Sequence, residues 1–279
     1  MSISLLLPTR GRPERLALFF QSLEDKSSQI DQIEVVLYFD DDDHDYDSYQ
    51  TVVCDSPLNT EIIVGPRISM GEMLSALFRA SKHEIIGLVN DDIVIETENW
   101  DQLIEDHFEL CLEDYLLFYP ADGFHKKGFP AFPFFNAKFL GSFEPPFPYY
   151  EGSHIDTHMI HVFQRLSDKG MAGIVHDEKI MFRHLHYRLD TSLFDETYAF
   201  RDRFGDDLYY LSLLPLIGAL PAQLRSNQKS LVWPDKTYVK SGLLILLGRV
   251  LLMESTASLR DRLIICLRYI ARAIYAKIF

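Results

Sequence analysis

The chain has 279 residues, of which 47% are hydrophobic, and its formal net charge at pH 7 is −14. A chain of this length and hydrophobic content can bury a substantial core, but the acidic balance argues against a nucleic-acid-binding surface, which would need a basic footprint. The three cysteines are scattered without metal-ligand spacing, and the first apolar run is only as long as a strand, so the sequence favours a reducing cytoplasm over secretion.

The N-terminal part of the chain alternates between strand-like and helix-like stretches. Residues 3–7 form an apolar run, the next six residues read as a turn, and residues 14–23 have apolar side chains at helical spacing. Two further strands are predicted at 34–39 and 61–64, followed by a helix at 70–80. Because strands that alternate with helices form βαβ units, the pattern predicts an α/β fold with a mainly parallel, doubly wound sheet.

A fourth predicted strand, residues 85–89, runs directly into two adjacent carboxylates, Asp91 and Asp92. In an open α/β sheet, ligands bind at the carboxyl ends of the strands. Two carboxylates held together there repel each other unless a cation or a proton intervenes. The segment therefore predicts a divalent metal that carries a phosphate. The alternative is a helix cap made by Asn90 and Asp91.

Three motifs occur in order along this half of the chain, and they read SLLLPTRGRPERL, VVLYFDDDD and IIGLVNDDIVI. Together they resemble the nucleotide-sugar-binding half of GT-A glycosyltransferases, particularly family 2. The resemblance implies a GT-A (Rossmann-like) sheet flanked by helices. It also implies an enzyme that moves a sugar from a nucleoside-diphosphate sugar to a hydroxyl, with inversion at the sugar.

The resemblance also implies which residues contact the donor. An acid after the second strand, Asp40 or Asp41, would hold the base or ribose, and a D-x-D element would hold the diphosphate through a metal. This element reads Asn90-Asp91-Asp92 here, so its first acid is an amide and Asp92 is the expected metal ligand. Mn²⁺ or Mg²⁺ is expected because the ligands are mainly oxygen. The residues expected to bind the nucleotide sugar are Pro8, Thr9, Arg10, Asp40, Asp41, Arg67, Asn90 and Asp91.

The middle of the chain, residues 123–148, is rich in Phe, Pro and Gly and has little periodicity. This composition predicts a shaped loop region on the acceptor side of the site. Its aromatic rings could stack on sugars or could build an ordinary core. The candidates for sugar contact are Phe132, Phe134, Tyr149 and Tyr150.

The candidate catalytic base follows this region, just before an amphipathic helix that runs to Lys169. In the family, an acid at the start of such a helix acts as the base, and Asp156 matches that place. A carboxylate near a helix N-terminus stays ionised and can accept the proton of an attacking hydroxyl. His154 is the competing base. The alternative for this position is an N-cap formed by Asp156 or Ser153.

Two histidines, His184 and His186, follow a predicted strand at 179–182 and would point to the same side if that strand continued. GT-A enzymes often supply a late histidine to the metal held by the D-x-D element, and this H-x-H resembles that feature. Imidazoles at this spacing can share a metal. His186, or else His184, is therefore expected to join Asp92 as a metal ligand.

The C-terminal tail differs from the rest in charge. Residues 240–279 contain seven basic and two acidic side chains, a balance of +5 that leaves −19 for the remainder. An apolar stretch at 242–253 is too short to span a membrane. Apolar residues then recur on one helical face, which is typical of a helix lying on anionic lipid but also of packing on the catalytic domain or in a homo-oligomer. We expect a GT-A domain at 1–225 and an amphipathic helical appendage at 226–279.

These observations favour a metal-dependent, cytoplasmic transferase that acts on a glycan or lipid-linked acceptor, at the inner face of a membrane if the tail binds lipid. Polysaccharide biosynthesis is the expected setting. A sugar-phosphate nucleotidyltransferase is an alternative, but the turn PTRGRP is a poor match to the Gly-rich loop that such an enzyme needs. A non-catalytic glycan- or nucleotide-binding protein is a further alternative, favoured by Asn90.

Overall fold

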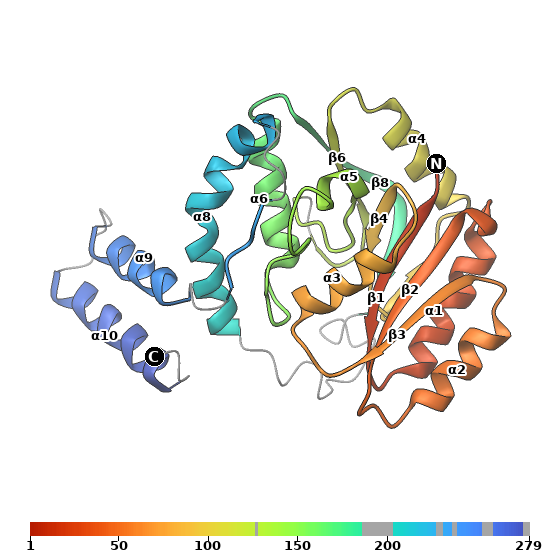
Figure 1. Cartoon of the computed structure of the whole chain (residues 1–279), viewed down its shortest axis with the longest axis horizontal. Coiled ribbons are helices and arrows are strands. Elements are labelled where there is room, and N and C mark those ends of the chain that lie inside the picture. The colour runs from red at the N-terminus through yellow and green to blue at the C-terminus, as the bar shows by residue number, and fades with distance from the viewer. Residues whose placement is uncertain (126–127, 186–202, 227–230, 236–238, 253–258, 276–279) are drawn as a thin grey trace.

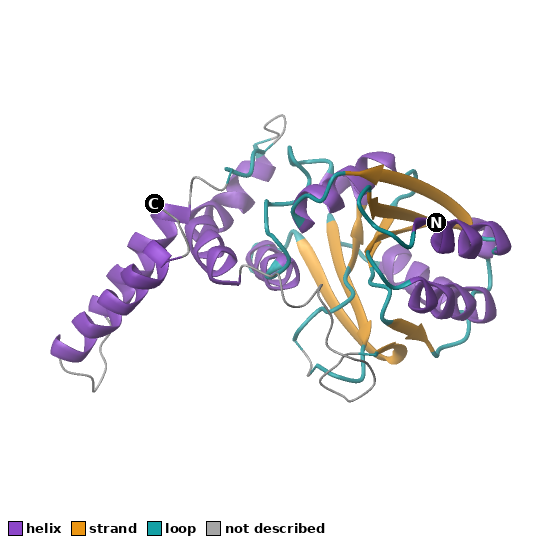
Figure 2. Ribbon diagram, turned by 90° about the horizontal axis from the view of Figure 1, so that it is seen from below, coloured by secondary structure: helices purple, strands orange, loops and turns teal. Residues whose placement is uncertain are grey.

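The computed structural model describes residues 1–125, 128–185, 203–226, 231–235, 239–252 and 259–275 (Figure 1). Within these residues the chain forms an eight-stranded sheet in the order β3-β2-β1-β4-β7-β6-β8-β5. Helices cover both faces of the sheet, and two C-terminal helices project from one side of this body (Figures 1 and 2). The sheet and its helices therefore form a body from which the tail stands apart.

The first half of the sheet is parallel, as the sequence predicts. β1 pairs in parallel with both β2 and β4, and β2 pairs in parallel with β3. A helix follows each of the first three strands, which gives the doubly wound arrangement. The bounds are β1 (Ile3–Thr9), α1 (Pro13–Lys26), η1 (Ile30–Gln32), β2 (Ile33–Asp40), α2 (Tyr46–Asp55), β3 (Asn59–Gly65), α3 (Met70–Ala80) and β4 (Ile85–Leu88).

The second half of the sheet is mixed. β7 is antiparallel to β4 and β6, β6 is parallel to β8, and β5 is antiparallel to the end of β8. β7 and α5 fall inside the region that the sequence predicts as a shaped loop. The sequence does not reveal them because elements of three and four residues are too short to show periodicity. The bounds are β5 (Ile93–Ile95), α4 (Trp100–Leu110), β6 (Tyr115–Ala121), β7 (Phe134–Asn136), α5 (Ala137–Leu140), α6 (Ile155–Ser167), β8 (Ala172–His184), α8 (Arg203–Arg225), α9 (Val239–Leu252) and α10 (Leu259–Tyr275).

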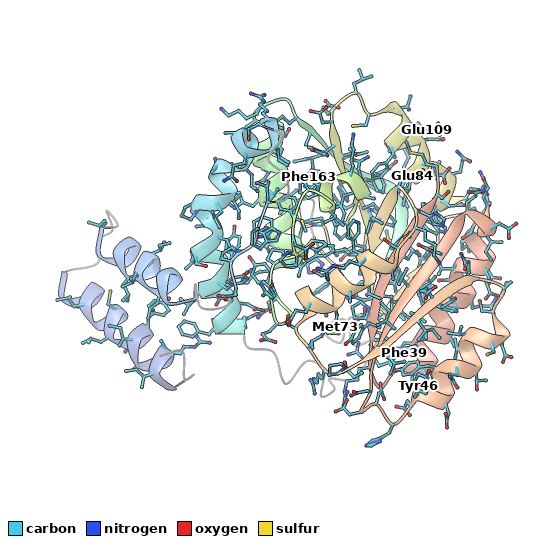
Figure 3. The ribbon with its side chains drawn as sticks, viewed as in Figure 1. Phe39, Tyr46, Met73, Glu84, Glu109 and Phe163 are labelled. Carbon is cyan, nitrogen blue, oxygen red and sulfur yellow. The ribbon has the colours of Figure 1, made fainter. Side chains whose placement is uncertain are left out.

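The core consists of two apolar layers, one on each face of the sheet. Alternate residues of β1 enter opposite layers, so that Leu5 packs with α1 and α4 whereas Leu6 packs with α3, α6 and α8. In the second layer, Phe163 of α6 lies 4.7 Å from Phe139, measured between ring centroids (Figure 3). Three of the four aromatic candidates for sugar contact are buried in these layers, namely Phe132, Phe134 and Tyr150. These three rings therefore serve the core.

Two segments beyond α8 differ in how they pack. Residues 231–235 lie against the sheet body, where Leu231 forms a bridge with Phe143 and the ring of Trp233 stacks on the ring of Phe143. α9 and α10 instead pack on each other and on the start of α8, through a small cluster at Phe204 and Leu208. The division of the chain at residue 225 stays a prediction.

The two tail helices leave apolar side chains exposed. Within the segments that the structure describes, no helix combines the length and apolarity needed to cross a membrane. Cys266 and Ala273 of α10 are buried toward its neighbours, while other apolar residues face solvent. Among the side chains described in α9 and α10, the exposed large apolar residues are Leu244, Leu252, Leu263, Leu267 and Ile274.

Candidate active site

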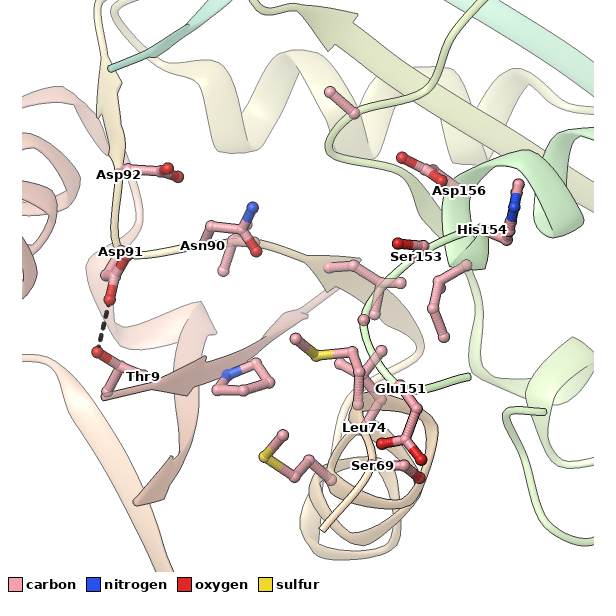
Figure 4. Close-up of a pocket in the computed structure, with 18 of the residues that line it drawn as sticks. Thr9, Ser69, Leu74, Asn90, Asp91, Asp92, Glu151, Ser153, His154 and Asp156 are labelled. Carbon is pink, nitrogen blue, oxygen red and sulfur yellow. Dashed lines mark hydrogen bonds between the residues drawn. The ribbon is translucent and has the colours of Figure 1, made fainter. Parts of the chain in front are cut away.

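A cleft of about 940 Å³ opens at the carboxyl ends of β1, β2 and β4 (Figure 4). One wall is formed by these strand ends, and the opposite wall by the residues that lead into α6. Asp41 is exposed and does not line the cleft, and His186 lies outside the described residues. The other predicted site residues all line it, namely Pro8, Thr9, Arg10, Asp40, Arg67, Asn90, Asp91, Asp92, His154, Asp156 and His184.

Asp91 joins the turn after β1 to the loop after β4. It accepts a hydrogen bond of 2.7 Å from the Thr9 hydroxyl and one of 3.0 Å from the Arg12 guanidinium. Burial raises the pKa of Asp91, and the positive charge of Arg12 opposes that rise. No helix begins here, since β5 starts at Ile93, so the proposed helix cap does not form. Asp91 therefore holds Thr9 and Arg12 in place in the cleft wall.

Asp92 is buried beside His184. Its Oδ2 lies 3.4 Å from His184 Nε2 and 3.9 Å from a guanidinium nitrogen of Arg15. The two residues meet because β5 pairs with the end of β8, and the N–H of Leu185 donates to the carbonyl of Asp92. A late histidine therefore does approach the D-x-D element, and among the described residues that histidine is His184.

A second carboxylate, Asp122 at the end of β6, approaches His184 from the other ring nitrogen. Asp122 Oδ2 lies 3.7 Å from His184 Nδ1 and 2.6 Å from His125 Nδ1. Ligand atoms of these three residues lie within 4.8 Å of one another, close enough to hold a metal ion. Neither Asp122 nor His125 was predicted as a site residue from the sequence. The signal that could have identified Asp122 is its place directly after an apolar strand.

The charges in this cluster shift one another's protonation. Burial alone would raise the pKa of Asp122, but the nearby His184 ring and the hydrogen bonds from His125 and from backbone N–H groups outweigh it and hold that pKa well below its usual range. Burial alone would lower the pKa of His184, but Asp122 and Asp92 raise it to about 9. Without a metal, the cluster therefore holds a protonated imidazole beside the ionised carboxylate of Asp122.

Asp40 ends β2 inside the cleft. Its Oδ2 accepts a hydrogen bond of 2.8 Å from Arg10, which also pairs with Asp42. Its Oδ1 is buried and has no hydrogen-bond partner among the residues that the structure describes. Burial raises the pKa of Asp40, and Arg10 opposes that rise. Asp40 therefore has an oxygen available to accept an N–H or O–H group of a ligand.

The opposite wall is held in place from α8. The buried carboxylate of Asp206 accepts hydrogen bonds from the backbone N–H groups of Glu151 at 2.8 Å, Gly152 at 3.2 Å and Ser153 at 2.8 Å. The same segment passes close to the start of α3, where a Cβ on Gly71 would lie 1.8 Å from the carbonyl oxygen of Pro148. The wall can therefore approach α3 only because residue 71 is a glycine.

The two candidate bases differ in their surroundings. His154 is the N-cap residue of α6 with a φ of 69°, and its Nε2 lies 2.7 Å from Asp207 of α8, while its ring stacks on Tyr210. Asp156 lies in the first turn of α6, and its carboxylate and that of Asp92 point toward the same open space (Figure 4). Burial raises the pKa of Asp156, and the Thr157 N–H that donates to it opposes the rise. Neither Asp156 nor Ser153 caps α6.

The chain is similar in structure to known glycosyltransferases, although its sequence is not. No family model matches the sequence, and no curated protein matches it. Among solved structures, TarS residues 1–349 from S. aureus in complex with UDP-GlcNAc superimposes with a TM-score of 0.54 at 12% identity, covering 99% of this chain and 73% of that chain. The mannosyltransferase PcManGT from Pyrobaculum calidifontis, in complex with GDP-Man and Mn²⁺, superimposes with a TM-score of 0.53 at 11% identity, covering 99% and 81%. The chain has the GT-A fold, and the fold prediction from its three motifs is confirmed.

Proposed function

We propose that this chain is a metal-dependent glycosyltransferase that moves a sugar from a nucleoside-diphosphate sugar to a hydroxyl of a glycan or glycolipid. The observation that carries the proposal is the pairing of two carboxylates across one cleft of a GT-A fold, Asp92 beside His184 on one wall and Asp156 on the other. TarS and PcManGT, which share the fold, were solved with UDP-GlcNAc and with GDP-Man and Mn²⁺, respectively.

The donor would lie along the wall of strand ends. Asp40, whose Oδ1 is buried without a hydrogen-bond partner in the described chain, would accept from the base or from a ribose hydroxyl. Arg10 is held at the mouth of the cleft by Asp40 and Asp42, and Arg67 lines the same side, so both guanidinium groups are placed to attract a diphosphate. Asp91 would contribute indirectly, by fixing Thr9 and Arg12.

Transfer would use Asp156 as the base. The carboxylate takes the proton of the acceptor hydroxyl while the acceptor oxygen forms its bond to the anomeric carbon and the bond to the diphosphate breaks. A raised pKa makes Asp156 a stronger base than an ordinary aspartate. His154, the alternative base, is engaged by Asp207. A divalent cation held at His184, Mn²⁺ or Mg²⁺, would neutralise charge on the departing diphosphate. The inverting outcome follows from the resemblance to family 2.

A second candidate function is binding of a nucleotide or glycan without transfer. It is favoured by the amide at Asn90 and by the engagement of Asp91 with Thr9 and Arg12, which leave one carboxylate of the D-x-D element facing the cleft. A binding protein of this kind would recognise the donor in the same cleft but would not turn it over.

A screen of nucleotide sugars by thermal unfolding, with and without Mn²⁺, tests the proposal. A donor present at one hundred times its dissociation constant should stabilise the fold by about 2.7 kcal/mol, and Asp92→Ala should remove the Mn²⁺-dependent part of that effect. Release of nucleoside diphosphate in the presence of acceptor glycans would then show turnover. Donor binding without any turnover would favour the second candidate, and no response to any nucleotide sugar would contradict both.

We further propose that α10 lies on an anionic membrane surface and brings the enzyme to a lipid-linked acceptor at the cytoplasmic face. Leu263, Leu267 and Ile274 of α10 are exposed while Cys266 and Ala273 pack inward. The tail has a balance of +5 against −19 for the rest of the chain, and basic residues near an anionic surface add attraction to apolar burial.

Sedimentation with phosphatidylserine vesicles at low salt tests this placement. The double variant Leu263→Ser with Leu267→Ser should lose vesicle binding. The matched control is Leu110→Ser with Leu112→Ser, which removes two exposed leucines from the sheet body and should leave vesicle binding unchanged. If the wild-type chain ignores the vesicles but forms a dimer that the α10 variant dissociates, the exposed face is an oligomer contact and the lipid proposal is wrong.

A further inference from the structure

His184 stands between two carboxylates, one at each ring nitrogen. Its Nε2 lies 3.4 Å from Asp92, and its Nδ1 lies 3.7 Å from Asp122, which in turn lies 2.6 Å from His125 Nδ1. The side of the ring that faces Asp122 and His125 therefore presents two imidazoles and a carboxylate together. The side that faces Asp92 presents a carboxylate and one imidazole.

The spacing on the Asp122 side suits a single bound ion. A cation that binds its ligands at about 2.1 Å brings neighbouring ligand atoms to about 3 Å from one another. The ligand atoms of Asp122, His125 and His184 all lie within 4.8 Å of one another. Small rotations of the side chains would therefore bring them onto one ion.

The backbone holds this cluster in position before any ion binds. The N–H of His184 donates to the carbonyl of Asp122 at 2.9 Å, because β6 and β8 run side by side to this point. The Asp122 carboxylate also accepts the N–H groups of Phe124 at 3.0 Å and His125 at 2.8 Å, which turns the chain so that the His125 ring returns to it. A preformed cluster of this kind loses little conformational freedom when it binds a cation.

We propose that Asp122, His125 and His184 bind a divalent transition metal, and that Asp92 orients His184 from the opposite ring nitrogen. A metal-bound histidine commonly donates its other N–H to a carboxylate, which fixes the ring and raises its basicity as a ligand. Two imidazoles and one carboxylate favour Mn²⁺, Co²⁺ or Zn²⁺ over Mg²⁺, which prefers oxygen ligands. The inference rests on the proposed function in one respect, since it assigns the ligands of the metal that the transfer would use.

Equilibrium binding of Mn²⁺ to the full chain without nucleotide, followed by electron paramagnetic resonance, tests the assignment. His125→Gln and Asp122→Asn should each weaken Mn²⁺ binding by at least about 10-fold. Asn at position 122 keeps an oxygen acceptor for the two backbone N–H groups, and thermal unfolding of both variants checks that the fold is retained. Zn²⁺ and Co²⁺ should displace Mn²⁺, whereas Mg²⁺ at the same concentration should not.

The matched control is His107→Gln. His107 forms a comparable pair with Asp177 at 3.1 Å, outside the cleft, and its loss should leave Mn²⁺ binding unchanged. If His125→Gln and Asp122→Asn bind Mn²⁺ like the wild-type chain, the assignment is wrong, while donor binding and transfer could still hold. If the three residues bind Mn²⁺ but no nucleotide sugar binds or is turned over, the proposed function fails and the metal assignment stands.

Discussion

The two walls of the cleft are built by different means. On the wall of strand ends, along which we propose that the donor lies and which we call the donor wall, Thr9, Asp40 and Asn90 stand at or just beyond the ends of parallel strands, so the topology of the sheet fixes their positions. The opposite wall, residues 148–157, contains no strand, and it is held by the carboxylate of Asp206 and by a close approach to Gly71. The donor wall thus depends on many backbone hydrogen bonds, whereas the opposite wall depends on a few polar contacts made over long sequence distances.

The largest expected effect isolates the chemistry of the opposite wall. Asp156→Asn keeps the size of the side chain but cannot accept a proton, so transfer should fall by roughly 10² to 10⁴ with donor affinity retained. Initial rates and donor titrations measure the two quantities separately. If His154→Ala is the inactive variant and Asp156→Asn remains active, the base is assigned to the wrong residue.

The next effect concerns what holds that wall in place. Asp206→Ala removes the shared acceptor of three backbone N–H groups and should lower the free energy of unfolding by about 3 kcal/mol. Urea unfolding measures this loss. Asp177→Ala serves as the control, because Asp177 is less buried and accepts one backbone N–H, from Lys179. Donor binding should survive Asp206→Ala, since the donor wall does not use it. Equal losses in the two variants would mean that the wall does not depend on Asp206.

The same contrast explains what the sequence could predict. Asp40, Asp91 and Asp92 are recognisable because each follows an apolar strand, and the predicted helix at 70–80 coincides with α3, which begins at a capping box of Ser69 and Glu72. Asp122 follows a strand too. Nothing in the local sequence indicates that β6 lies beside β8, the pairing that brings Asp122 close to His184.

The polar contacts of the opposite wall leave still less trace in the sequence. Asp206 and Asp207 lie more than 50 residues beyond the groups they bind, Glu151 to His154. Local periodicity carries no information about pairing over such a distance. Strand ends are therefore predictable from the sequence, whereas the side chains that fix a loop are known only from the fold.

The smallest expected effect is a dependence of the free energy of unfolding on pH. It arises from a histidine of α6, the helix that follows the opposite wall. His158 of α6 is buried, with its Nδ1 3.1 Å from the Tyr150 hydroxyl and its ring against Trp233. Burial lowers the pKa of His158 from 6.5 to about 3. The unfolded chain therefore binds this proton at a higher pH than the folded chain. The stability that His158 contributes is fully present above about pH 6.5 and is lost progressively as the pH falls toward 3.

Comparison of the wild-type chain with His158→Phe at pH 7 and pH 5 measures this term. Because one pH unit corresponds to about 1.4 kcal/mol per proton, the wild-type chain should lose about 2 kcal/mol more of its unfolding free energy than the variant over this interval. Parallel losses in the two proteins would show that His158 is not the group responsible.

The pairing of β5 with β8 has a consequence for the order in which the protein is made. β1 to β4 and all the pairings among them lie within residues 3–88, but Ile93 pairs with His184, and the carbonyl of Asp92 accepts the N–H of Leu185. Closing a loop of this length costs conformational entropy before its contacts form. A chain still being synthesised can thus assemble the donor wall's strands while Asp92 lacks its histidine, so the cleft gains His184 only after residue 185 has left the ribosome.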